Sequence, residues 1–120
     1  MTVDLETKAT KRKLRQLAGV AYERELGAEL SKLETEFARW RRDEMDPFEL
    51  SDRIHRFHDG ASRDLYVLYN RLHPGQSVAR AVALQLLEEK EVPSELLEAL
   101  ERPIHFYREQ LTEPEEQDED

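Results

Sequence analysis

Apolar residues recur every three or four positions along most of this chain, which is the spacing of one face of an α-helix. The first stripe steps by four, three, four and three residues: Leu26, Leu30, Leu33, Phe37 and Trp40. A stripe of smaller residues precedes it: Leu14, Leu17, Ala18 and Ala21. Together they predict one long helix over about residues 4–42. Because this helix would span roughly 60 Å, we expect it either to bend at Gly19 or Gly27 or to project into a dimer, and we favour the dimer.

A second helix has a clear start signal. Asp46 is a good N-cap, Pro47 suits the first helical position, and Glu49 completes a capping box. The apolar residues that follow keep helical spacing through Asp59-Gly60: Leu50, Ile54, Phe57, Ala61, Leu65, Leu68 and Leu72. We therefore predict a continuous helix over 47–72. Gly60 is expected either to let a neighbouring helix approach closely or to act as a hinge.

The opposite side of this second helix is aromatic. Its members, at 100° per residue, are Phe48, His55, Tyr66 and Tyr69. A helix that is apolar on one side and aromatic on the other is usually packed on both sides. These four residues are therefore the predicted partner-binding surface, unless the helix is central in a bundle and the aromatic side is core.

Two shorter helices are predicted after the turn at His73-Pro74-Gly75. The first covers 78–90, is capped by Ser77, and is apolar almost all round, so we expect it to be the most buried element. The second covers 94–111, is capped by Ser94, and is expected to kink or restart near Pro103. No segment shows the alternation of a strand. The sequence thus predicts an all-α protein, a compact bundle of four to five helices in a single domain over residues 1–111.

The charge is concentrated at the two ends of the chain. Residues 112–120 hold six of the acids behind the net charge of −9 and no base, and we expect this acidic tail to be disordered. A basic cluster lies near the other end: Lys8, Lys11, Arg12, Lys13 and Arg15. This cluster is a candidate for contact with nucleic-acid phosphates, but it lacks the interleaved aromatic residues of a single-strand binder, so nucleic-acid binding is not favoured.

The composition of the chain indicates which cellular compartment it fits. The chain has no cysteine, which excludes disulfides and thiolate sites and fits a reducing compartment. Its start lacks the apolar run of a signal peptide, and no stretch has the roughly 20 apolar residues of a membrane span. We therefore expect a cytoplasmic protein without a membrane partner.

One cluster of residues suggests metal chemistry. Asp52, His55 and Asp59 fall near one face of the second helix, with His58 at its margin, and carboxylate and imidazole groups are good ligands for zinc, iron or manganese. The Asp-x-x-His spacing echoes the motif of di-iron bundles. Those bundles carry the motif on two helices, whereas here it occurs once, so a solvated face with internal ion pairs is the preferred interpretation.

Arg53 and His58 fit the Arg-x4-His spacing found in small all-α ribonucleases of the HEPN type. There the arginine would hold a phosphate and the histidine would move a proton. Ile54 stands where that family usually has a polar residue, and about one such match is expected by chance in this chain. A ribonuclease or metal-binding bundle is therefore only an alternative.

Signals for other enzyme classes are missing from the sequence, including a phosphate-binding loop, a nucleophile elbow and a dinucleotide fingerprint. We therefore lean against an enzyme and expect no cofactor. The preferred interpretation is a small helical interaction or regulatory module that binds a macromolecular partner or itself, most simply as a homodimer. The basic N-terminal helix leaves nucleic-acid association as an alternative.

Overall fold

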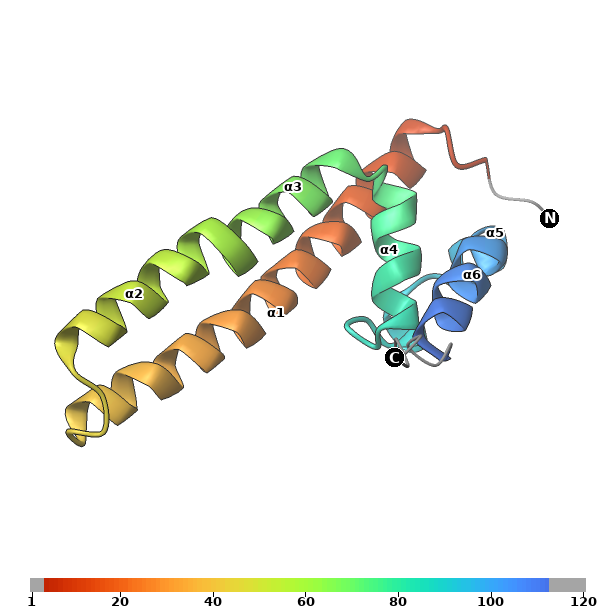
Figure 1. The fold of residues 1–120 in the computed structure, drawn as a ribbon. Coiled ribbons are helices and arrows are strands. Elements are labelled where there is room, and N and C mark those ends of the chain that lie inside the picture. The colour runs from red at the N-terminus through yellow and green to blue at the C-terminus, as the bar shows by residue number, and fades with distance from the viewer. Residues whose placement is uncertain (1–3, 113–120) are drawn as a thin grey trace, which may run out of the picture. The chain divides into compact units, whose positions relative to one another are not determined.

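The computed structural model describes residues 4–112, and every regular element in this range is helical (Figure 1). The elements are α1 (Lys8–Arg41), α2 (Pro47–Phe57), α3 (Arg63–Arg71), α4 (Pro74–Ala83), α5 (Ser94–Ala99) and α6 (Glu101–Thr112), with a π-helical turn at His58–Ser62 and a short 3-10 turn at Glu89–Glu91. The predicted all-α class and the long N-terminal helix are confirmed. The predicted disordered tail lies, apart from Thr112, outside the described residues.

Contacts between Cα atoms divide the chain into two compact units. We call residues 22–73 the hairpin unit, and we call residues 4–21 together with 74–112 the core unit. Helix α1 contributes its N-terminal part to the core unit and its C-terminal part to the hairpin unit. The single domain predicted over residues 1–111 stays a prediction.

In the hairpin unit, α2 and α3 run alongside the C-terminal part of α1 (Figure 1). The backbone stays helical through the π turn, with φ −62° and ψ −47° at His58 and φ −62° and ψ −48° at Ser62. This matches the expected continuity through Gly60. The expected close approach of a neighbouring helix at Gly60 is wrong, because a Cβ atom placed there would meet nothing within 4 Å.

The start of α2 follows the predicted cap only in part. The Asp46 carboxylate accepts a hydrogen bond of 2.8 Å from the backbone N–H of Glu49, and Pro47 occupies the first helical turn. The side chain of Glu49 forms an ion pair of 3.2 Å with Arg53. The cap therefore rests on the Asp46 side chain, which satisfies one of the free N–H groups at the helix start.

The core unit holds most of the buried apolar side chains of the described chain. Its core contains Leu14, Leu17 and Ala21 from α1, Val78, Ala79, Ala81 and Val82 from α4, and Leu87, Val92, Leu96, Leu100 and Ile104 from the segments that follow. Helix α4 packs against α6. The expectation that the helix after His73 is the most buried element is confirmed, since seven of the ten residues of α4 are buried.

Two helix starts and one cap differ from those predicted. Helix α1 begins at Lys8 rather than residue 4, because Asp4 forms a turn with the N–H of Glu6 at 2.9 Å and the Thr7 hydroxyl accepts from the N–H of Thr10 at 3.3 Å. Helix α4 begins at Pro74, so Ser77 lies inside it rather than capping it. Helix α5 begins at residue 94 as predicted, but Ser94 is its first helical residue, and Pro93 holds the cap position.

The end of α4 also differs from the prediction, and the cause is a residue in the left-handed conformation. Helix α4 ends at Ala83 rather than near residue 90, because Gln85 adopts a φ of 62°. The N–H groups of Gln85 and Leu86 then donate to the carbonyls of Val82 and Ala81 at 3.1 and 2.9 Å. This is the Schellman arrangement, which satisfies the last carbonyls of a helix.

Helix α1 ends in the same way. Asp43 has a φ of 60°, its N–H donates to the Trp40 carbonyl at 3.0 Å, and the N–H of Glu44 donates to the Arg39 carbonyl at 2.9 Å. An ion pair of 2.9 Å between Arg42 and Glu44 closes the turn. The hydrogen bond from Arg42 lowers the pKa of the Glu44 carboxyl below its ordinary value.

The last predicted helix is divided near its proline, as expected. Helix α5 ends at Ala99, Leu100 has a φ of −100° and a ψ of 9°, and α6 starts at Glu101. Pro103 therefore lies in the first turn of α6, where its missing N–H breaks no helical hydrogen bond.

Candidate interaction surface

Burial differs sharply between the two units. Of the sixteen buried apolar residues in the described chain, the hairpin unit contains only Met45, Leu50 and Leu65. The same unit contains five of the seven large apolar residues that are exposed: Leu30, Trp40, Phe48, Ile54 and Tyr66. A pair of helices that buries so little gains little from the hydrophobic effect. The hairpin unit is therefore the part of the chain that has most to gain from a partner.

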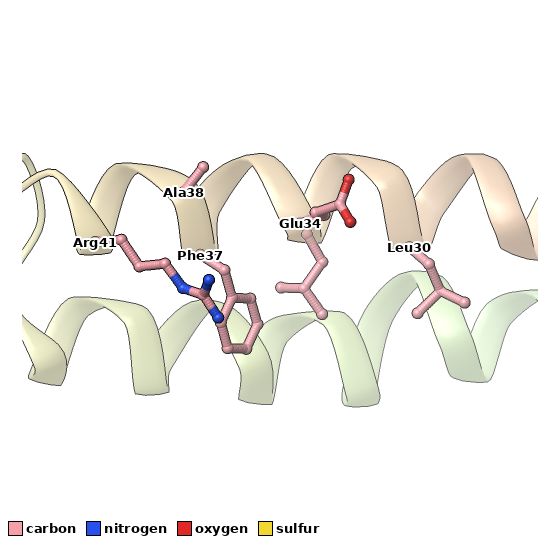
Figure 2. A pocket seen from close by; sticks show the side chains of 6 residues that line it. Leu30, Glu34, Phe37, Ala38 and Arg41 are labelled. Atoms are coloured by element: carbon pink, nitrogen blue, oxygen red, sulfur yellow. The ribbon is translucent and has the colours of Figure 1, made fainter.

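A shallow groove of about 600 Å³ lies on the C-terminal half of α1. Its lining consists of Leu30, Leu33, Glu34, Phe37, Ala38 and Arg41. These positions follow one another in steps of three and one, which is the pattern of a single helix face. Figure 2 shows Leu30, Phe37 and Arg41 along one edge of this face, with Glu34 and Ala38 along the other. We call these six residues the α1 face.

The α1 face is mainly apolar, and its two charges have opposite signs. Leu30 is 47% exposed although it belongs to the leucine stripe of α1. Glu34 and Arg41 stand seven positions apart, and neither forms an ion pair within residues 4–112. Other charged residues of α1 do form such pairs, for example Glu29 with Lys32 and Glu36 with Arg39, at 3.0 and 3.2 Å.

Contacts between α1 and α2–α3 hold the hairpin unit together. The rings of Tyr22 and Tyr69 stack with their centroids 4.6 Å apart and their planes 4° from parallel. The Tyr69 hydroxyl donates to the Glu25 carboxylate at 2.8 Å, and Arg53 pairs with Glu36 at 3.6 Å. Of the α1 face, Leu30, Glu34 and Arg41 are exposed, whereas Leu33, Phe37 and Ala38 are half-buried.

The predicted aromatic partner surface is not a single patch. Phe48 is 87% exposed and Tyr66 is 61% exposed, and His55 is also exposed. Tyr69 instead faces α1 through its stack with Tyr22. Because Phe48 and Tyr66 are eighteen positions apart on a helix, about 27 Å separates them along its axis. Two of the four residues are thus exposed aromatics at distant points of α2–α3.

The structure does not bring the three predicted metal ligands together. Asp52 pairs with Arg56 at 2.8 Å, and His55 and Asp59 are exposed. Within residues 4–112, no group of three His, Asp or Glu side chains comes close enough together to hold a metal ion. Asp52 therefore belongs to an ion pair along the helix surface.

The two residues of the ribonuclease-like spacing, Arg53 and His58, lie in different surroundings. Arg53 forms ion pairs with Glu49 at 3.2 Å and with Glu36 at 3.6 Å, so its guanidinium ties α2 to α1. His58 begins the π turn and is exposed. Arg53 thus has a structural role in the hairpin unit that the sequence pattern did not suggest.

The basic cluster lies at the start of α1 in the core unit. Lys8, Arg12 and Arg15 are exposed, and Lys13 is half-buried. Lys11 pairs with Glu6 at 3.0 Å. The first turn of α1 contains no acidic residue, and Lys8 and Lys11 lie in this turn, where the helix dipole disfavours positive charge.

Comparison with known proteins adds no relative, since no family model, curated protein or solved structure matches this chain. Within the described range, no helix is both long enough and apolar enough to cross a membrane.

Sequence reasoning found only part of the α1 face. Leu30, Leu33 and Phe37 are visible in the sequence as part of the first apolar stripe. Glu34, Ala38 and Arg41 are not among the predicted site residues. The signal that could have found them is the repeated three-and-four spacing from Leu30 to Arg41, which includes two charges of opposite sign on the edge of an apolar stripe.

Proposed function

We propose that this protein is a helical interaction module that binds another protein chain through the α1 face of its hairpin unit. One observation carries the proposal: a shallow groove lined by residues at helical spacing, from Leu30 to Arg41, is open to solvent, and its Leu30 is 47% exposed. Side chains at this spacing normally lie against another helix. The lack of cysteine supports a reducing, cytoplasmic setting for this module.

The lining of the groove favours a protein partner over a small molecule. All six lining residues come from one helix, so they form one side of a contact and enclose nothing. Small-molecule sites are usually concave and surround most of the ligand. A second helix packed against the α1 face would instead cover the exposed parts of Leu30 and Phe37.

Photo-cross-linking in the native cell tests the proposal. A photo-reactive phenylalanine derivative is placed at Leu30 in the full chain, and the matched control places it at Lys32. Lys32 is two positions away on α1, with a side chain that is 73% exposed and directed off the groove. We expect a discrete adduct with a protein chain, of this or another sequence, from position 30 and much less from position 32.

Equal adducts from both positions would show random encounters and contradict the proposal. The lack of any adduct from position 30, in a folded protein present at normal level, would also contradict it. Folding of each variant is checked by its helical circular dichroism and its melting temperature.

A further inference from the structure

The α1 face is complementary to itself. Glu34 and Arg41 lie at equal distances on either side of the point between Phe37 and Ala38. A two-fold axis through that point would place Glu34 of each copy opposite Arg41 of the other. It would also set Phe37 against the small Ala38 of the other copy, a large side chain against a small one.

We infer that the occupant of the α1 face is a second copy of this chain, packed antiparallel to the first around a two-fold axis near Phe37 and Ala38. The inference rests on the proposed function, because it names the partner of the same surface. With the axis at this point, the two α1 helices overlap over residues 34–41, which are the last two turns of each. Each copy contributes one carboxylate and one guanidinium, so both unpaired charges of the face gain a partner.

A parallel arrangement of the same two faces is disfavoured by the same charges. Helices packed in parallel with a two-fold axis along them bring identical positions together, so Glu34 would meet Glu34 and Arg41 would meet Arg41. Like charges facing each other lower affinity, whereas opposite charges set partner choice and orientation. Antiparallel packing is the orientation that turns both repulsions into attractions.

The inference also explains why the apolar part of the face stays small. Phe37 and Ala38 lie at the proposed axis, with Glu34 on one side of them and Arg41 on the other. A stable protein interface generally has an apolar centre and a polar rim. Here the charged rim and the apolar centre both lie on α1. The two-fold contact therefore forms the whole interface from one segment of each copy.

Charge reversal tests the pairing in solution. The dissociation constant of the full chain is measured by analytical ultracentrifugation at low ionic strength, for the natural chain, for Glu34→Arg, for Arg41→Glu and for the double variant. Each single variant turns both cross-copy pairs into repulsions, so we expect it to weaken dimerisation about tenfold or more. The double variant restores opposite charges at both contacts and should regain most of the affinity.

The control variant is Lys32→Glu, which makes the same change in net charge as Arg41→Glu but lies off the α1 face. We expect it to leave the dissociation constant almost unchanged. A 1:1 mixture of Glu34→Arg with Arg41→Glu should form a heterodimer more readily than either variant forms a homodimer.

The orientation is tested by a distance measurement. The chain has no natural cysteine, so Glu23→Cys accepts a single nitroxide label on an exposed site of α1. Two labels in the antiparallel dimer should be about 45 Å apart along α1, since each lies well to one side of the axis. A parallel dimer would bring them within about 10 to 20 Å, near the spacing of two packed helices.

The outcomes separate this inference from the proposed function. A natural chain that stays monomeric up to about 200 µM, where even a weak dimer is populated, overturns the self-pairing. An adduct from position 30 with a different protein would then leave the proposed function standing. A dimer that neither charge reversal weakens, or whose labels lie close together, also overturns the inference.

Discussion

Ser77 carries the one buried side-chain polar atom of the described chain that has no hydrogen-bond partner there. The residue is 1% exposed, inside the most buried helix. A buried hydroxyl without a partner costs its lost hydration, which amounts to about 1–3 kcal/mol. Ser77 therefore lowers stability at the centre of the core unit.

We expect Ser77→Ala to raise the free energy of unfolding by about 1 kcal/mol, because it removes this hydroxyl and improves helix propensity. Urea denaturation measures the change. The matched control is Ser51→Ala at an exposed position in α2, where only the helix propensity changes. A loss of stability in Ser77→Ala would show that the hydroxyl has a partner after all.

Gln85 holds the left-handed conformation that ends α4, with a φ of 62°. Glycine is the usual residue at this point of a Schellman motif, and other residues pay roughly 1–2 kcal/mol for the conformation. We expect Gln85→Gly to raise the free energy of unfolding by up to about 1 kcal/mol. The gain is limited because glycine also increases the conformational entropy of the unfolded chain. Thermal denaturation measures it.

The control for Gln85→Gly is Gln16→Gly, which makes the same exchange inside α1 and should cost about 1 kcal/mol. Asp43→Gly, at the equivalent end of α1, should gain less, because aspartate tolerates the left-handed region better than glutamine does. If Gln85→Gly destabilised the protein as much as Gln16→Gly, the strain at Gln85 would be disproved.

At the scale of the elements, α1 continues through two glycines without a break. A Cβ atom at Gly19 or Gly27 would meet nothing within 4 Å. Gly19→Ala and Gly27→Ala should therefore each raise the free energy of unfolding by about 0.5–1 kcal/mol through helix propensity alone. Guanidinium denaturation of the two single variants checks this, and a loss in Gly27→Ala would reveal a packing partner on that turn.

The existence of the helices could be predicted, but their ends could be predicted only in part. Three-and-four spacing and the Asp46-Pro47 cap located α1 and the α2–α3 helix, including its passage through Gly60. The end of α1 was predicted to within one residue, at about residue 42. The end of α4 before Gln85 could not be predicted, because glycine, the usual signal for a left-handed residue, is absent there. The π turn at His58–Ser62 also has no counterpart in an ideal helical period.

At the scale of the whole molecule, the apolar stripe of α1 was predictable but its exposure was not. Spacing shows that Leu30 and Phe37 share a face with Leu26 and Trp40, yet it cannot say how much of that face α2 and α3 cover. The contacts that decide this are long-range: the Tyr22–Tyr69 stack and the Arg53–Glu36 ion pair join residues from separate helices. Glu34 and Arg41 became part of a candidate site only once those contacts were known.

The unequal burial of the two units predicts unequal stability along the chain. At low protein concentration, the backbone amides of α2 and α3 should exchange with deuterium faster than those of α4, because few buried apolar contacts hold the hairpin unit closed. Raising the concentration should slow exchange in α2 and α3 and leave α4 nearly unchanged, since association stabilises only the unit that carries the interface. Mass spectrometry of peptides from both regions measures the exchange. The variant Phe37→Glu should lose the concentration dependence. Exchange in α2 and α3 that is independent of concentration in the natural chain would mean that self-association does not protect the hairpin unit.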